Sequence, residues 1–121
     1  MAMLKDKIAA FIEKIQVIDG VTACALVSRD GIIAGKHFDR EFNEPWFGAL
    51  AATILASAES AGNLISMKSI SAVTIRAANL SILVMGAGEH FLIAAILKSG
   101  ANQEDVCSHI GAVAAEIGQV M

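Results

Sequence analysis

Several residue types are scarce in this chain, and each scarcity excludes a class of protein. Only 17% of the 121 residues are charged, nine are lysine or arginine, and the formal net charge is −3. Proteins that bind nucleic acid draw much of their affinity from a basic surface, so this composition argues against nucleic-acid binding. The two cysteines, Cys24 and Cys107, belong to no CxxC pair and have no spacing typical of a zinc site.

Long apolar runs are also missing. The longest weakly charged stretch runs from Pro45 to Ala58, which is shorter than the roughly 20 residues that cross a bilayer. Charges at Lys5, Asp6 and Lys7 interrupt the region where a signal peptide would have its apolar core. We therefore expect a cytoplasmic protein without a membrane-inserted segment.

What the chain has in excess is apolar residues, which make up 55% of it. Disordered chains have the opposite balance, with low hydrophobicity and high net charge. A chain of this length can bury enough surface for one hydrophobic core but not for two domains. We expect a single domain that comprises residues 1–121.

The spacing of apolar residues predicts eight elements. Recurrence every three or four positions is typical of an amphipathic helix, and short apolar or alternating runs are typical of strands. Asp30-Gly31 is a strong hairpin signal, and Pro45 suits the first turn of a helix. The predicted helices cover 3–16, 46–65 and the segment from Asn102 almost to Met121, and the predicted strands cover 21–28, 32–38, 70–78, 80–85 and 91–97.

The order of these elements predicts an α+β fold. Connections this short join antiparallel neighbours, because a parallel crossover takes a dozen or more residues. One five-stranded antiparallel sheet with helices on both faces, in the order α-β-β-α-β-β-β-α, buries all the elements in one core. The helix over 46–65 is apolar on most sides, so it is expected to be buried on most sides.

No group of side chains predicts catalysis, a cofactor or a metal. His37 beside Asp39 and His90 beside Glu89 are interpreted as surface residues, since neither pair has a third group that would orient it. Cys24 and Cys107 are both assigned to core packing. The Gly86–Gly88 segment lacks the third glycine of a dinucleotide loop and the GKS or GKT sequence of a P-loop. The acidic loop at 39–44 does not match a calcium loop, and its residues Arg40, Glu41 and Glu44 are retained as candidate partner contacts.

Two features point to association with a second copy. Small residues on the helix over 46–65 permit another backbone to approach closely, and the strand over 70–78, if it lies at the sheet edge, leaves backbone groups open to pairing. One two-fold axis could bury both features in a homodimer. The residues predicted at this interface are Ala49, Ala52, Ala56, Ser57, Ser60, Ala72, Thr74 and Arg76.

The chain also resembles the Roadblock/LC7 family of roadblock-type dynein light chains and MglB-like GTPase regulators. The resemblance runs from Leu4 to Ile117 and is carried by an Ala-rich central helix and two short segments, Ile18-Asp19-Gly20-Val21 and Ser28-Arg29-Asp30-Gly31. It implies a five-stranded sheet with one helix on one face and two on the other. It also implies a dimer that forms through the third strand and the central helix.

The same resemblance implies a function, which is to bind and regulate a small Ras-like GTPase without supplying catalytic residues. Two alternatives stay open from the sequence. An antiparallel sheet flanked by helices can hold a pocket for a small ligand, so a ligand sensor is one. The other is a structural, light-chain-like subunit that is insensitive to the nucleotide state of its partner.

Overall fold

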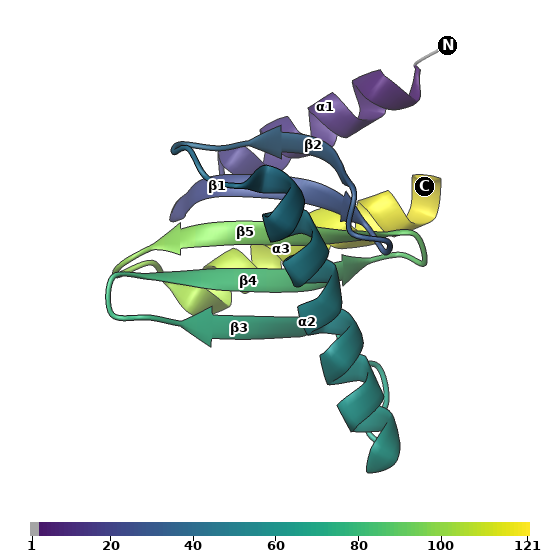
Figure 1. Cartoon of the computed structure of the whole chain (residues 1–121). Helices are drawn as coiled ribbons and strands as arrows, with labels where there is room; N and C mark the ends of the chain where they lie inside the picture. Colours follow the sequence, from purple (N-terminus) through teal and green to yellow (C-terminus); the bar gives the residue numbers. More distant parts are fainter. Residues whose placement is uncertain (1–2) are drawn as a thin grey trace.

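The computed structural model describes residues 3–121, and it contains the eight predicted elements in the predicted order (Figure 1). The elements are α1 (Leu4–Gln16), β1 (Val21–Ser28), β2 (Ile33–His37), α2 (Glu44–Leu64), β3 (Ala72–Arg76), β4 (Leu80–Ala87), β5 (Phe91–Lys98) and α3 (Gln103–Val120). The predicted α+β fold class is therefore confirmed.

All five strands form one antiparallel sheet in the order β2-β1-β5-β4-β3. The strands β2 and β3 are consequently its two edges. β4 and β5 are buried along most of their length, whereas Thr74, Ile75 and Arg76 of β3 are exposed. The position of β3 at an edge is what the dimer prediction required.

The three helices lie on the two faces as the family resemblance implies, with α2 on one face and α1 and α3 on the other (Figure 1). The larger core lies between the sheet and the α1–α3 pair, and Ile15, Ile110 and Ile117 are fully buried there. The smaller core lies under α2, where Leu55 packs over Val27, Val84 and Leu92.

Two hairpin turns meet the helices through pairs of glycines, one pair on each face. The β1–β2 turn contains Gly31, which has a φ of +91°, and a Cβ built there would lie 2.8 Å from the Cα of Ala49 in α2. A Cβ on Gly48 would lie 2.7 Å from the carbonyl oxygen of Gly31. Gly88 of the β4–β5 turn and Gly118 of α3 make the equivalent contact on the opposite face. Backbone therefore packs directly on backbone at both sites.

Several boundaries differ from the prediction for local reasons. α2 begins at Glu44 because the side chain of Asn43 accepts a hydrogen bond from the backbone N–H of Trp46 at 3.1 Å and caps the helix. β3 is shorter than the predicted 70–78. Residues 70 and 71, which were predicted to start the strand, lie outside it, because Ile70 packs against Gly62 of α2. Its predicted end turns back at Ala77, whose N–H donates to Leu80 O at 2.9 Å.

Candidate interaction surface

The outward side of α2 is apolar and exposed, which corrects the expectation that this helix is buried on most sides. Only Gly48, Ala51, Leu55 and Gly62 of the helix are buried. Trp46 and Leu50 have exposed fractions of 66% and 52%, and Leu64 at the C-terminal end reaches 88%. One sheet face can cover only one side of a helix, so the residues on the far side face solvent in a single chain. Exposed large apolar side chains at both ends of one side of a helix favour an interaction surface there.

The small residues predicted to form an interface lie on and beside this outward side of α2. Ala49, Ala56, Ser57 and Ser60 are exposed, whereas Ala52 is half-buried and packs against the core under the helix. Ala49 lies near the N-terminal end, next to the β1–β2 turn. These side chains leave the helix backbone open to close approach.

The edge strand β3 lies beneath the second half of α2. The helix crosses the sheet and continues beyond β3, so its last turn extends past the sheet (Figure 1). The segment that follows adds Ile65 and Met67, which are 71% and 53% exposed. An apolar overhang therefore stands beside an open sheet edge.

The hydrogen-bond pattern identifies which residues of β3 face that open edge. Ser71 O accepts from Gly86 N at 3.0 Å and Ala77 N donates to Leu80 O, so Ser71 and Ala77 belong to hydrogen-bonded pairs with β4. Such pairs alternate with non-hydrogen-bonded pairs along an antiparallel ladder. The backbone groups of Ala72, Thr74 and Arg76 therefore point away from β4. These are the three β3 residues that the sequence placed in the interface.

The candidate partner contacts of the 39–44 loop do not form one cluster. Arg40 pairs with its neighbour Asp39, and two guanidinium nitrogens lie 2.7 and 2.8 Å from the two carboxylate oxygens. This hydrogen bond lowers the pKa of Asp39 and raises that of Arg40. Glu44 lies in the first turn of α2 and pairs with Lys36 of β2, while Glu41 is exposed between these two pairs.

Sequence reasoning missed the role of Arg29. Its guanidinium donates to Gly88 O at 2.7 Å and lies 3.5 Å from Glu59 of α2. It thereby ties the β1–β2 turn to the β4–β5 turn and to the helix. Its Nε is buried and has no hydrogen-bond partner among residues 3–121. Local sequence patterns carry no signal for a contact between residues 59 positions apart.

The two cysteines have different surroundings. Cys24 is buried in β1, and burial raises the pKa of its thiol to about 12. Cys107 is exposed, so its assignment to the core is wrong. The buried residues of α3 next to it are Val106 and Ile110, and Cys107 is rotated about 100° from Val106 around the helix.

This difference predicts selective thiol labelling. A disulfide reagent such as DTNB at pH 8 should react quickly with one thiol per native chain, and with two after unfolding, because Cys107 is exposed whereas Cys24 is buried with a raised pKa. The released chromophore measures the stoichiometry. Cys107→Ser should abolish the fast phase, and two equally fast thiols in the native chain would contradict the burial of Cys24.

Among residues 3–121, no three histidine, cysteine, aspartate or glutamate side chains gather closely enough to hold a metal ion. Within the same residues, no helix combines the length and the apolar character that a bilayer crossing requires.

Solved structures show where this fold occurs. MglB from Myxococcus xanthus superposes with a TM-score of 0.89 at 15% identity, covering 99% of this chain and 91% of that one. A structure described as "MglB with tetrameric arrangement" gives 0.86 at 15% identity, covering 98% and 91%. Profilin II from Acanthamoeba castellanii is more distant, with a TM-score of 0.65 at 17% identity, covering 93% and 98%.

Sequence comparison identifies the family. No curated protein matches the chain. The family model for the Roadblock/LC7 domain matches residues 7–97, which is about three quarters of the sequence. The match spans the elements from α1 to β5, including α2 and β3, which carry the exposed surface. This chain belongs to the Roadblock/LC7 family.

Proposed function

We propose that this protein is a homodimeric, non-catalytic module that binds and regulates a small Ras-like GTPase. The observation that carries the proposal is the exposed apolar side of α2 beside the open edge of β3. Family membership supports the choice of a GTPase as partner, because regulation of such enzymes is the function that the Roadblock/LC7 resemblance implies.

The dimer forms by antiparallel pairing of β3 with β3 of a second copy. With Thr74 on the two-fold axis, its outward N–H and C=O bond the Thr74 of the other copy, and Ala72 lies opposite Arg76. This register keeps the two Arg76 residues about 13 Å apart along the strand. A register centred on Arg76 would instead place two like charges directly opposite each other, which is destabilising.

The overhang of α2 then covers the second copy. Each 100 Å² of apolar surface removed from water contributes about 2.5 kcal/mol. Among the predicted interface residues on α2, the exposed Ala56, Ser57 and Ser60 let the two helices approach each other, and Leu64 and Ile65 pack over the partner's sheet. Ala49 lies at the β1–β2 turn and Ala52 packs against the core under α2, so the proposed contact does not use them.

The other sheet edge is protected from such pairing. The register of β2 against β1 shifts between Leu26 and Val27, which leaves Ala34 as an extra, bulged residue. β2 also carries a lysine, Lys36. Bulges and edge lysines discourage edge-to-edge association, and β3 has neither feature. This contrast supports β3 as the edge that pairs.

The pairing and position of the three arginines agree with a regulatory role in which this protein supplies no catalytic residue. An arginine finger is an exposed guanidinium that enters the GTPase site. Arg29 is bonded to the β4–β5 turn, Arg40 is paired with Asp39, and Arg76 lies on the strand proposed to form the dimer. We therefore infer that the protein acts by binding, and the exposed Glu41 is kept as a candidate contact of the partner.

Capture of purified small GTPases by the immobilised protein tests this function. Each GTPase is loaded with GDP or with a GTP analogue, and we expect at least one to be retained several-fold more in one state. Glu41→Lys should weaken that capture, while Glu13→Lys on α1, which makes the same charge reversal on the opposite face, should leave it unchanged. Retention independent of nucleotide would favour the structural-subunit alternative, and no retention of any GTPase would contradict the proposal.

A further inference from the structure

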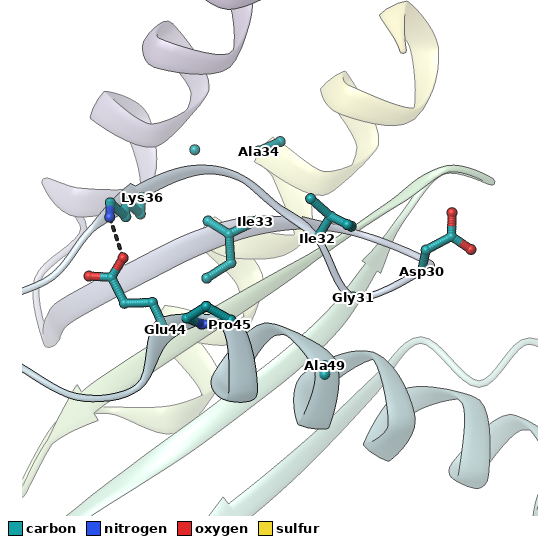
Figure 2. A pocket seen from close by; sticks show the side chains of 10 residues that line it. Asp30, Gly31, Ile32, Ile33, Ala34, Lys36, Glu44, Pro45 and Ala49 are labelled. Carbon is teal, nitrogen blue, oxygen red and sulfur yellow. Dashed lines mark hydrogen bonds and ion pairs between the residues drawn. The ribbon is translucent and has the colours of Figure 1, made fainter.

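The edge strand β2 borders a cavity that the proposed function does not use. It has a volume of about 550 Å³, within the range of ligand sites, and lies between β2 and the first turns of α2 (Figure 2). Its walls are mainly apolar, with Ile32 and Ile33 on the strand side and Pro45 and Ala49 on the helix side. Ile32 is 67% exposed at the mouth.

The backbone of β2 beside this cavity has groups open to a partner. Ser28 N donates to Ile32 O at 2.8 Å. The backbone N–H and C=O groups of the even-numbered residues near the end of β1 therefore point toward β2. The alternation of the ladder then turns the backbone groups of Ile33, opposite Val27, and Lys36, opposite Ala25, toward the open edge. The side chain of Ile33 points from the strand toward Pro45 (Figure 2).

The bulge at Ala34 decides what kind of strand can bind here. It breaks the two-residue repeat, because three positions rather than two separate the outward groups of Ile33 and Lys36. A long regular edge strand from a second copy cannot keep its register across this break. A short flexible segment can bond at the two points while it places one side chain in the cavity, as occurs when peptides bind between a sheet edge and a helix.

The charges around the cavity indicate the chemistry of that segment. At one end Lys36 is neutralised by Glu44, as the dashed line in Figure 2 marks. At the other end the carboxylate of Asp30 is exposed and has no ion-pair partner among residues 3–121. The uncompensated charge at the cavity is therefore negative and lies just before the start of β2.

We propose that this groove binds a short extended segment of a partner protein, which adds antiparallel to β2, inserts an aliphatic side chain between Ile33 and Pro45, and places a basic residue near Asp30. The antiparallel direction puts the basic residue at the C-terminal end of the segment. About six residues, or roughly 20 Å of extended chain, span the distance from Lys36 to Asp30. This site is separate from the β3 edge and does not depend on the proposed GTPase partner.

An NMR titration tests the proposal with a defined probe. The probe is a six-residue peptide of alternating threonine and valine that ends in lysine and is blocked at both termini. Added to the isotope-labelled full chain, it should shift the amide signals of β2 and of the start of α2, and leave those of β3 in place. Methylation of the peptide nitrogens that bond β2 should weaken binding at least tenfold, because the backbone donors are lost.

Charge exchange tests the assigned direction and chemistry. The same peptide ending in glutamate should bind several-fold more weakly to the native chain. Asp30→Asn, which preserves the turn, should remove that preference, and Glu13→Gln on α1 should retain it. Shifts at β3 instead of β2, equal binding of the methylated peptide, a preference for lysine that persists in Asp30→Asn, or shifts at β2 caused by concentrating the chain alone would each overturn the proposal.

Discussion

Replacing Gly48 with alanine is expected to destabilise the protein, although alanine is the better helix former. In an unobstructed helix interior the change would raise stability by about 1 kcal/mol. At Gly48, however, the new methyl group would lie 2.7 Å from Gly31 O and 3.0 Å from Cγ1 of Ile33. Gly31 cannot move away easily, because its own backbone lies against Ala49. Forcing an extra methyl group into such a contact costs about 1–3 kcal/mol.

Urea unfolding followed by circular dichroism, at one protein concentration for all variants, measures this effect. Gly111→Ala in α3 is the matched control, since the nearest atom to its new Cβ would be Met85 Sδ at 3.9 Å, an ordinary contact. We expect Gly111→Ala to raise the free energy of unfolding by about 0.5–1 kcal/mol and Gly48→Ala to lower it. A rise in both variants would show that α2 does not rest on the β1–β2 turn.

Replacing Thr74 with proline is expected to separate the dimer while leaving the fold of each chain intact. The backbone N–H of Thr74 points away from β4, so proline removes a donor that the sheet within the chain does not use. In the dimer the same change leaves a carbonyl of each copy without its donor, at about 1–3 kcal/mol apiece. The two sites together cost about 2–6 kcal/mol, which raises the dissociation constant roughly 30-fold or more.

Sedimentation velocity compares the mass of this variant with that of the native chain, and circular dichroism confirms that it folds. Thr74→Ala retains the N–H and should stay dimeric, which separates the backbone effect from loss of the side chain. Lys36→Pro, which removes an outward N–H at the other edge, should also stay dimeric. Dissociation of Lys36→Pro but not of Thr74→Pro would place the interface at β2 and contradict the assignment to β3.

The sequence was sufficient to predict the elements because each element has a local signature. The spacing of Ile8, Ile12 and Ile15 defines α1, and Asp30-Gly31 defines the first hairpin. Boundaries were less accurate where a single contact decides them. The side chain of Asn43 extends α2 to Glu44, and the packing of Ile70 on Gly62 delays the start of β3.

The exposure of α2 could not be predicted from the sequence pattern, whereas that of Cys107 could have been predicted from the helical period of its neighbours. A helix that is apolar all round has no pattern that separates its sheet-facing side from a side reserved for a partner, so the exposure of Trp46 and Leu50 became visible only in the structure. In α3, a shift of one position from Val106 to Cys107 turns a side chain from the core to solvent.

The groove beside β2 was missed because it depends on features that are far apart or irregular. Ile33 and Pro45 come from different elements, and the only local signal for the bulge at Ala34 is the neighbouring Gly35 within the strand pattern. By contrast, the three β3 residues predicted at the interface, Ala72, Thr74 and Arg76, are those whose backbone groups face the open edge. Strand alternation in the sequence records that these three residues share one side of the strand, whereas which backbone groups face the open edge depends on the register with β4.

Sedimentation velocity of the native chain at micromolar concentration tests the central claim most directly. If the exposed side of α2 and the open edge of β3 pair with a second copy as proposed, the species should have a mass of about 25 kDa, twice the 12.6 kDa of one chain. The mass should stay near this value on dilution until the dissociation constant is reached. A single species of 12.6 kDa throughout the micromolar range would contradict the account.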